Sequence, residues 1–341
     1  MNKRQILFFI GIIGLVIACQ KTDDKLDTSL FEFVQPEHFP APVYNLASNP
    51  ISKEGFELGR KLFYDPILSR NNTISCGSCH ISQHAFTHHG HDVSHGIDDR
   101  LGVRNSMPLM NLAWSKGFFW DGGVFHLDLA PIAPIENEVE MDEQFVTVLE
   151  KLRNSKDYPT LFQKAFGSSE INSVNTLQAL SQFMLLLISD NSKYDKVIRK
   201  ETNFSAAEQR GYTLYQQKCS TCHQEPLFTD YSYRDNGLGI NPSQDQGRYE
   251  ITGLESDKLK FKVPSLRNLA YTSPYMHDGS FITLEAVINH YRREIKQTDN
   301  LDPLLRNGIA LSNMEVSDLT AFLNTLNDEK FIRNTLFSEQ P

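Results

Sequence analysis

Apolar residues recur at the spacing of an α-helix in several stretches of the chain. Between Asn172 and Ser189 they share one helical face, at Val174, Leu177, Leu180, Phe183, Met184, Leu187 and Ile188. Ser205 and Glu208 form a capping-box pattern at the start of another helix. Ser312 and Glu315 form a second such pattern. Strand signals are few and short, so the pattern predicts a mainly α-helical fold.

Two long segments, 98–135 and 226–275, lack a regular period and are rich in Gly, Pro, Asn and aromatic residues. Segments of this length without regular structure usually wrap around something or carry function.

A weak internal repeat divides the chain. The pattern Gly59-x-x-Leu62-Phe63 recurs as Gly211-x-x-Leu214-Tyr215, and each copy precedes a pair of cysteines. The repeat predicts two domains, residues 50–195 and 196–341.

The first residues have the pattern of an export signal. Two basic residues precede an apolar run from Ile6 to Ala18, which is short for a membrane-spanning helix of about 20 residues. Its end at Cys19 resembles the bacterial lipoprotein signal, in which the cysteine is lipidated and becomes the N-terminus. An uncleaved anchor and a plain secretory signal are the alternatives. We expect a signal peptide at 1–18, a tether at 19–49, and a periplasmic or cell-envelope protein anchored to the membrane through Cys19.

Composition and charge exclude several classes of protein. Of the 341 residues, 40% are hydrophobic and 22% are charged, which excludes collagen, coiled coil and wholesale disorder. With 33 basic and 42 acidic residues, the net charge is −9, so we expect no nucleic-acid partner. Five cysteines are too few for a small disulfide scaffold.

Four of the cysteines form two Cys-x-x-Cys-His motifs, CGSCH and CSTCH. In this attachment pattern of c-type haem, both thiols bond to the porphyrin and the histidine is the proximal iron ligand. The residues expected to hold two haems are Cys76, Cys79, His80, Cys219, Cys222 and His223. A zinc site would not need the trailing histidine, and a thioredoxin-like pair would need a strand–helix setting that the pattern lacks. The export signal agrees, because haem is attached to such proteins outside the cytoplasm.

From about residue 50 to residue 330, the chain resembles the bacterial dihaem cytochrome c peroxidase family. Besides the two motifs, the stretches that carry the resemblance are AFTHHGHDVSHGIDDRLGVRNSMPLMNLAW, FFWDGGVFHLDLAPIAPIENEVEM and FKVPSLRNLAYTSPYMHDGSFITLEAVINHY. The resemblance implies two cytochrome c-like domains, with hydrogen peroxide reduced at the N-terminal haem. It also implies that the C-terminal haem passes electrons from a small cytochrome or copper protein, and it allows a homodimer.

The resemblance assigns His95 as the displaceable sixth ligand of the N-terminal iron, or as a residue of the distal pocket. Peroxide has to reach the metal, so such a ligand must be able to leave. Spacing alone does not choose among the histidines of this segment, which also include His84, His88, His89 and His91. A solvent-exposed histidine-rich loop is the alternative interpretation.

Two further roles follow from the resemblance. Glu140 matches the distal carboxylate, which moves a proton from the inner to the outer oxygen of peroxide. Glu138 is its competitor, and a surface acid in an acidic run is the alternative. Trp120 matches the aromatic residue between the haems, where an indole lowers the tunnelling barrier or carries a transient radical. A core tryptophan is the alternative, and Trp114, which has no such match, is expected to be structural.

Asn105, Thr272 and Pro274 fall on the family's calcium site between the domains. The resemblance implies that one side-chain amide and two backbone carbonyls bind the ion together with water. A loop junction without metal is the alternative.

One position departs from the family pattern. In the well-known peroxidases, a methionine 14 positions after the histidine of the His-Asp-Gly stretch is the sixth ligand of the C-terminal haem, and counting from His277 gives Tyr291. A thioether raises the reduction potential, whereas a phenolate favours ferric iron and lowers it. Tyrosine here resembles MauG, the dihaem enzyme that completes the tryptophan-derived quinone of methylamine dehydrogenase. His290 could ligate instead, and Met276 and Met314 fit less well.

Three functions remain open. The favoured one is a peroxidase, and the others are a MauG-like enzyme that oxidises a partner protein and a dihaem electron carrier. Glu140 argues against a carrier, because a carrier needs no distal acid. Tyr291 keeps the MauG-like alternative open.

Overall fold

A computed structural model describes residues 31–340. The predicted signal peptide and the Cys19 anchor lie outside these residues. Among residues 31–340, no helix has both the length and the apolar character needed to cross a membrane.

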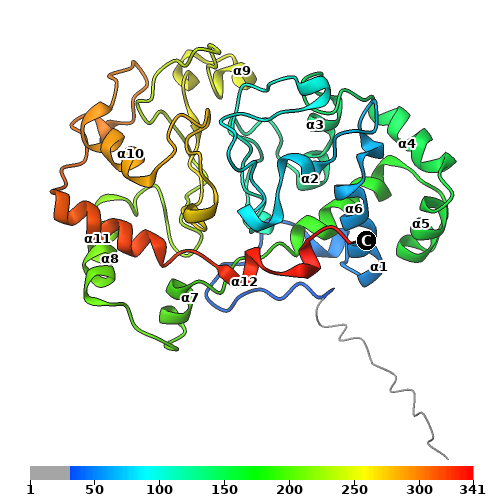
Figure 1. Ribbon diagram of the computed structural model, residues 1–341, viewed down its shortest axis with the longest axis horizontal. Helices are drawn as coiled ribbons and strands as arrows, with labels where there is room; N and C mark the ends of the chain where they lie inside the picture. The colour runs from blue at the N-terminus through cyan, green and yellow to red at the C-terminus, as the bar shows by residue number, and fades with distance from the viewer. Residues whose placement is uncertain (1–30, 341) are drawn as a thin grey trace, which may run out of the picture. The chain divides into compact units, whose positions relative to one another are not determined.

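The described chain is mainly helical, as predicted (Figure 1). Its α-helices are α1 (Lys53–Tyr64), α2 (Cys76–Cys79), α3 (Ile132–Glu136), α4 (Phe145–Asn154), α5 (Tyr158–Phe166), α6 (Ser173–Leu185), α7 (Lys193–Ile198), α8 (Ala206–Lys218), α9 (Tyr249–Thr252), α10 (Leu284–Asn289), α11 (Asn313–Asn324) and α12 (Glu329–Ile332). Two short strands, β1 (Tyr233–Arg234) and β2 (Phe261–Lys262), pair antiparallel with Tyr233 opposite Lys262. We call residues 50–195 the first half and residues 196–328 the second half.

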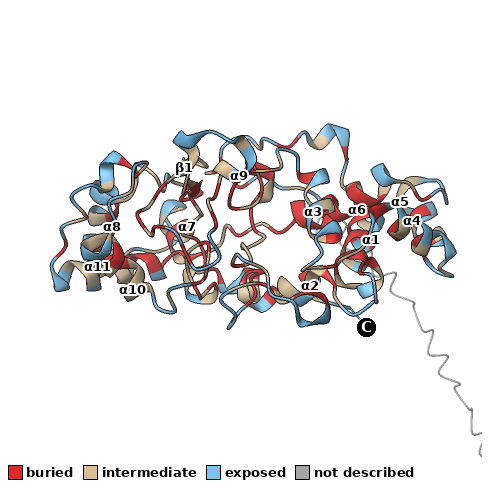
Figure 2. Cartoon of the chain, turned by 90° about the horizontal axis from the view of Figure 1, so that it is seen from above, coloured by how far each residue is buried: buried red, intermediate tan, exposed pale blue. Residues whose placement is uncertain are grey.

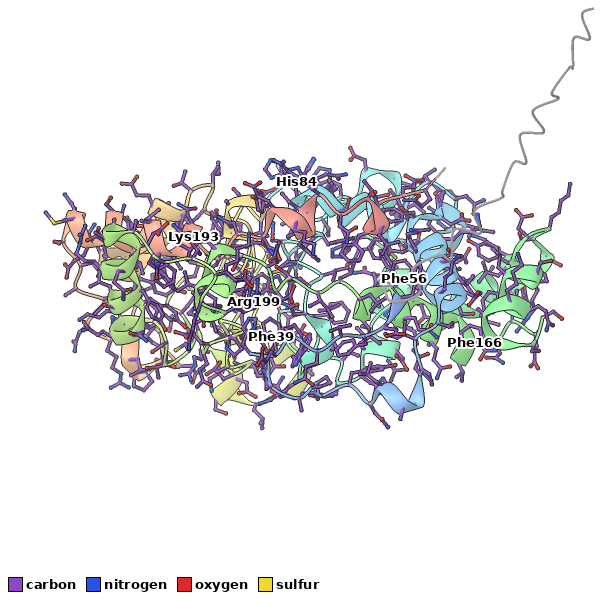
Figure 3. All side chains as sticks on the ribbon, turned by 90° about the horizontal axis from the view of Figure 1, so that it is seen from below. Phe39, Phe56, His84, Phe166, Lys193 and Arg199 are labelled. Carbon is purple, nitrogen blue, oxygen red and sulfur yellow. The ribbon has the colours of Figure 1, made fainter. Side chains whose placement is uncertain are left out.

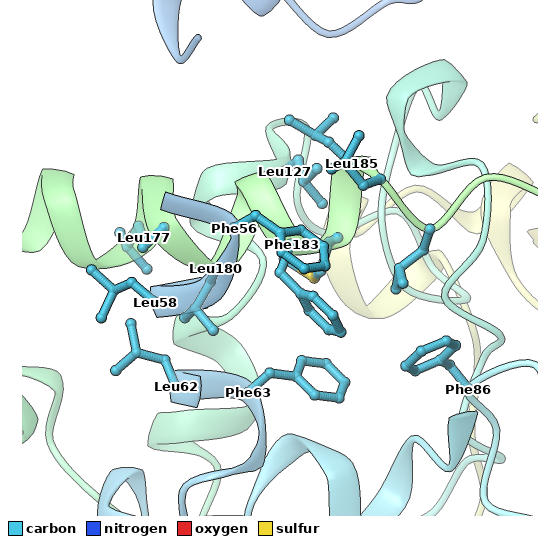
Figure 4. Packing of buried hydrophobic residues seen from close by; sticks show 14 of the residues in the cluster. Phe56, Leu58, Leu62, Phe63, Phe86, Leu127, Leu177, Leu180, Phe183 and Leu185 are labelled. Carbon is cyan, nitrogen blue, oxygen red and sulfur yellow. The ribbon is translucent and has the colours of Figure 1, made fainter. Parts of the chain in front are cut away.

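Helices α1 and α6 cross at close range in the first half. Gly59 permits the crossing, because a Cβ at this position would lie 1.9 Å from the carbonyl oxygen of Ala179. Around the crossing, the Phe183 ring packs 5.5 Å from that of Phe56 and 5.0 Å from that of Phe63, centroid to centroid. Figure 4 shows these rings among the buried leucines of the same core.

Helices α8 and α11 use the same crossing in the second half. A Cβ at Gly211 would lie 1.9 Å from the carbonyl oxygen of Asp318. Phe322 follows Asp318 by one turn and is fully buried. The weak sequence repeat therefore corresponds to one helix crossing used twice, and in both copies the glycine is required by backbone contact.

The helix starts agree with the capping patterns. Asn172 accepts a hydrogen bond from the backbone of Asn175 at the start of α6. Ser205 opens α8 and Ser312 opens α11, each with the reciprocal bonds of a capping box. The side-chain oxygens thus bind backbone N–H groups that have no partner within the helix.

The two irregular segments, 98–135 and 226–275, contain short turns, α3, α9 and the two strands instead of long elements. This agrees with the prediction. Buried residues nevertheless follow these loops as well as the helices (Figure 2). They include Trp114, Trp120 and Arg267, so the loops supply part of the interior.

Residues 31–49, which the sequence assigns to a tether, pack against the folded body, and we call them the N-terminal strap. Phe39 is 4% exposed and lies among packed side chains (Figure 3). Its ring meets the Trp114 ring edge-on at 5.0 Å, and the Trp114 indole N–H donates to the Pro40 carbonyl at 2.7 Å. A tether therefore does not describe residues 31–49. The strap escaped prediction because it is held by isolated aromatic residues without a period.

The last described residues, 329–340, return to the first half (Figure 1). The Tyr64 hydroxyl donates to the Phe337 carbonyl at 2.7 Å, and the Arg60 guanidinium donates to the Leu336 carbonyl at 2.8 Å. The end of the chain, which was expected to belong to the second domain, thus packs on α1.

Candidate haem centres and peroxide site

The second Cys-x-x-Cys-His motif follows the end of α8. The carbonyls of Phe228 and Pro264 accept hydrogen bonds from His223 Nδ1 at 3.2 and 3.1 Å, which leaves Nε2 for a metal. Burial lowers the pKa of His223, so the imidazole is neutral and able to ligate. Cys219 and Cys222 are not disulfide-bonded. Both thiols therefore remain available for thioether bonds.

A cavity of about 230 Å³ is lined by these three residues and by a largely apolar wall. The apolar part of the wall includes Leu266, Leu269, Leu284, Leu305, Leu319 and Leu323. One polar atom of the wall is buried without a partner, His277 Nε2, and the His277 ring stacks on Phe261 at 3.6 Å. Two thiols, one ligand nitrogen, apolar walls and an unpaired polar atom fit a c-type haem, whose ring is apolar and whose edge carries carboxylates.

Tyr291 lies on the wall of this cavity. The residues that share one helical face of α10 and the turn after it all line the cavity, namely Leu284, Val287, Ile288 and Tyr291. Burial raises the pKa of Tyr291 to about 12, although a hydrogen bond to the Asn236 side chain lowers it.

The alternative ligand, His290, is turned away from the cavity. Its Nε2 donates to the Asn236 carbonyl at 3.0 Å, and His290 does not line the cavity wall. Met314 is 72% exposed, whereas Met276 lines the wall. Tyr291 and Met276 are thus the two predicted candidates that face the haem site.

The first Cys-x-x-Cys-His motif forms the short helix α2 and the residue after it. His80 Nδ1 donates to the Phe86 carbonyl at 2.7 Å, and burial lowers the pKa of the imidazole. The first motif therefore presents a neutral Nε2 in the same way as the second. Cys76 and Cys79 are also free of disulfides, so this site fits a second c-type haem by its donor set.

Glu140 lies beside this first motif. Burial raises the pKa of the Cys79 thiol to about 11, and the nearby Glu140 carboxylate adds to the shift. Burial also raises the pKa of Glu140, while a 2.8 Å hydrogen bond from the Asn137 amide to its Oε1 lowers it. Glu138 is exposed, and its carbonyl binds Arg100. Of these two acids, Glu140 is the less exposed one, and its carboxylate lies near the Cys79 thiol.

His95 meets the same motif through its backbone, since its carbonyl accepts a contact from Cys79 Sγ at 3.5 Å. Its ring nitrogens have protein partners, with Nε2 at 3.2 Å from His91 Nδ1 and Nδ1 at 3.3 Å from Asp99 Oδ1. Binding of iron by His95 would require one of these contacts to break. The rest of the cluster pairs among itself: His84 stacks on His89 and His88 on His91, and Figure 3 labels His84.

Trp120 belongs to the first half and lines the cavity of the second half. It is 8% exposed, and its indole N–H donates to the Asn105 carbonyl at 2.8 Å. Asn105, Thr272 and Pro274 line the same cavity. The Asn105 amide nitrogen donates to the carbonyls of His91 and Asp92, so its Oδ1 is the atom left to bind a cation.

The charged groups around Trp120 carry no signal in the sequence that would predict their place at the site. Arg104 binds Asp245 of the second half through two hydrogen bonds of 2.6 and 2.8 Å, and it also binds Asp121. Lys262 is buried and lines the cavity, and its ammonium binds the Gly117 carbonyl. Lys262 stands in the FKVPSLRN stretch quoted above, but the pattern gave no reason to assign it a role.

Comparisons with known proteins agree with this arrangement. The di-haem cytochrome c peroxidase family model matches residues 53–203, and the cytochrome c family model matches residues 208–327. A methylamine utilization protein MauG of Methylophilus methylotrophus is 33% identical over 302 residues, or 86% of this chain and 88% of the relative. A cytochrome c551 peroxidase of Nitrosomonas europaea is 33% identical over 292 residues, or 83% of each chain.

A solved structure extends the likeness to the fold. The crystal structure of a MauG-like protein associated with microbial copper homeostasis has a TM-score of 0.84 and 33% identity, and the match covers 90% of this chain and 99% of that chain. The matched regions contain both attachment motifs and both cytochrome c-type domains, which imply two c-type haems. The chain therefore belongs to the di-haem cytochrome c peroxidase family, which includes MauG-like members.

Proposed function

We propose that this protein reduces hydrogen peroxide to water at the N-terminal haem site, with electrons that enter through the C-terminal haem from a small cytochrome or copper protein. The observation that carries the proposal is Glu140, a half-buried carboxylate near Cys79 with a raised pKa. An electron carrier has no use for such a group.

Glu140 is the group that moves the proton. When bound, the haem iron supplies the electrons and the coordination site for peroxide cleavage. The Glu140 carboxylate accepts the proton of the inner peroxide oxygen and returns it to the outer one, so that water is the leaving group. The Asn137 amide fixes Oε1 and leaves the other carboxylate oxygen for this transfer.

His95 is proposed as the displaceable distal group. Its backbone contact with Cys79 keeps the loop at the haem site, while both ring nitrogens have protein partners. A ligand with such alternatives can leave iron without a large cost, which opens the site to peroxide. Trp120 is proposed as the bridge for electrons between the haems, because it extends from the first half into the cavity of the second.

A calcium ion is proposed at Asn105, Thr272 and Pro274, which line one cavity wall. The side-chain amide oxygen and two backbone carbonyls are the oxygen ligands that calcium prefers, with water completing the shell. The ion would join the loop before Trp120 to the loop before His277.

A second candidate function is MauG-like oxidation of a partner protein. Tyr291 favours it, because a phenol faces the cavity where the well-known peroxidases have a methionine. A phenolate ligand would make this haem hard to reduce and ill-suited to accept electrons from a small donor.

The cellular location is proposed from the leader, with the periplasmic or cell-envelope protein held to the membrane through a lipid on Cys19. Metabolic labelling with a radioactive fatty acid tests this anchor. Wild type should be labelled, and a Cys19→Ala variant should be secreted without label. A homodimer is also proposed, and light scattering of the mature protein tests it.

The function is tested by supplying peroxide and a reduced small cytochrome c or copper protein to the purified dihaem protein. The proposal predicts that two donor molecules are oxidised for each peroxide consumed, because reduction of peroxide to two waters takes two electrons. Peroxide consumption without oxidation of any reduced donor, combined with oxidation of aromatic residues in an added protein, would favour the MauG-like function.

A further inference from the structure

Lys262 of β2 holds the loop that carries Trp120. Its backbone N–H donates to the Trp120 carbonyl at 2.7 Å, and its ammonium Nζ donates to the Gly117 carbonyl at 2.7 Å. Both acceptors belong to the first half, whereas Lys262 belongs to the second half and lines the haem cavity. One residue thus touches the proposed electron bridge and the wall of the C-terminal haem site.

The ammonium is buried with few partners. Lys262 is 7% exposed and forms no ion pair with any residue from 31 to 340. Asp121 is the carboxylate that acts on it, but the oxygens of Asp121 already bind Arg104 and the Gly123 backbone. An ammonium has three donors, and a single carbonyl satisfies one of them. Burial lowers the pKa of Lys262 to about 8, as expected for an incompletely compensated charge.

Packing alone does not require this charge, because methionine has a similar length and would fill the space without the cost of burying a cation. An anionic group that completes the hydrogen bonds of the ammonium would offset that cost. A haem bound in the cavity would supply such a group, since a haem carries two carboxylates at its edge.

We propose that Lys262 is a positioning residue that couples Trp120 to the C-terminal haem and raises the reduction potential of that haem by its charge. The inference rests on the role proposed for Trp120, but the effect on the potential does not depend on peroxide chemistry. A positive charge near the cavity disfavours ferric iron relative to ferrous iron, because oxidation adds a positive charge to the haem. The same ammonium fixes the Gly117 carbonyl and thereby the approach of Trp120.

Three variants of the dihaem protein separate charge from hydrogen bonding. Lys262→Met removes both, Lys262→Gln keeps a donor for the Gly117 carbonyl without charge, and Lys262→Arg keeps the charge. The matched control is Lys260→Met, because Lys260 lies two positions earlier, is partly exposed and pairs with Asp257 at 3.5 Å.

The first readout is a spectroelectrochemical titration without peroxide. At the wild-type midpoint of the C-terminal haem, the ratio of reduced to oxidised haem should fall by about tenfold or more in Lys262→Met and Lys262→Gln. It should change by less than about twofold in Lys262→Arg and Lys260→Met. The N-terminal haem should keep its midpoint in all variants. An unchanged C-terminal midpoint in the two uncharged variants would overturn the proposal.

The second readout is amide hydrogen exchange of the peptide that contains residues 117–121. Exchange should be faster in Lys262→Met than in Lys262→Gln, because only the amide can still bind the Gly117 carbonyl. Equal exchange in all variants would overturn the positioning part.

Haem loading is also informative. If both uncharged variants fail to take up the second haem while Lys262→Arg is fully loaded, the charge is required at the site and the proposal is supported. If Lys262→Arg fails as well, Lys262 has a packing role and the proposal is overturned. Because none of these measurements uses peroxide, their failure leaves the proposed peroxidase activity to its own test.

Discussion

Glu138 and Glu140 lie two positions apart in one acidic run, and their surroundings differ. Glu138 is exposed, whereas Glu140 is held by Asn137 and lies close enough to Cys79 to raise the pKa of that thiol. The turn that contains them is fixed by its backbone, since the Ile97 N–H donates to the Glu140 carbonyl at 2.7 Å. At the scale of single residues, proton transfer depends on this difference.

Glu140→Gln should leave haem content unchanged and reduce peroxide turnover by about a hundredfold or more, the size expected for a lost general acid–base. The amide keeps the shape of the side chain but cannot carry the proton. Steady-state peroxide consumption measures the effect, and Glu138→Gln is the matched control with near wild-type turnover. Equal losses in the two variants would contradict the assignment.

The pH dependence of turnover should report the surroundings of Glu140. Burial raises its pKa and the Asn137 hydrogen bond lowers it, so the carboxylate is protonated at a higher pH than an exposed glutamate, whose pKa is about 4.3. Turnover should therefore fall as the pH drops through this raised value. Asn137→Ala removes the hydrogen bond that lowers the pKa of Glu140, so in this variant turnover should fall at a still higher pH. If turnover fell at the same pH in wild type and in Asn137→Ala, a group other than Glu140 would be responsible for the fall.

Tyr291→Phe should shift the midpoint of the C-terminal haem upward and change its ferric spectrum, because a phenolate ligand stabilises ferric iron. The N-terminal haem should be unaffected. Met276→Leu is the matched variant, since Met276 lines the same cavity. If Met276→Leu changes the spectrum and Tyr291→Phe does not, the methionine is the ligand and the family pattern is restored by a different residue.

The two c-type haems could be predicted because covalent attachment imposes a local spacing on the sequence. Lys262 and His277 could not be assigned roles in this way. Their importance comes from burial in a cavity wall built by segments far apart in the sequence. The sequence also could not show that His290 binds the Asn236 carbonyl while its neighbour Tyr291 lines the cavity.

At the scale of elements, the helix starts at Ser205 and Ser312 could be predicted from the sequence, whereas the helix crossings and the strap could not. Ser205 and Ser312 carry a local capping signal, and Gly59 and Gly211 stand where a second helix approaches. The strap is held by tertiary contacts that leave no periodic pattern. Its His38 Nε2 lies 2.8 Å from Asp195 of α7, which is also held by Arg267.

Asp195→Asn should lower the free energy of unfolding by about 3–5 kcal/mol, because it leaves the buried Arg267 without its carboxylate. Arg267 and Asp195 are both fully buried and joined by bonds of 2.8 and 2.9 Å. Denaturant unfolding of the dihaem protein measures the change. Glu201→Gln, which breaks an exposed pair with Arg199, is the control and should cost less than about 1 kcal/mol. A similar small loss in both variants would contradict the role of the buried pair.

The pair of Arg267 and Asp195 also determines the direction in which the free energy of unfolding changes with pH. Burial alone would raise the pKa of Asp195, but hydrogen bonds from Arg267 and His38 outweigh it and hold the pKa well below its usual range. The stabilisation is therefore fully present above the unfolded pKa of about 3.9 and is lost as the pH falls through the folded value.

At the scale of the whole molecule, the two halves supply one attachment motif each, and the first half completes the cavity of the second. Cys76→Ala and Cys219→Ala should therefore each leave a protein with one covalent haem. A pyridine haemochrome assay and a haem-stained gel measure the content. Two covalent haems in either variant would contradict the attachment by these motifs.

The most direct test of the account is a single turnover. The fully reduced dihaem protein stores one electron at each iron, and it is mixed anaerobically with one equivalent of peroxide in a stopped-flow spectrometer. The account predicts that a single peroxide oxidises both haems in wild type, and that the same reaction is slower by about a hundredfold or more in Glu140→Gln. A C-terminal haem that stays reduced, or oxidation at the same rate in the two proteins, would contradict it.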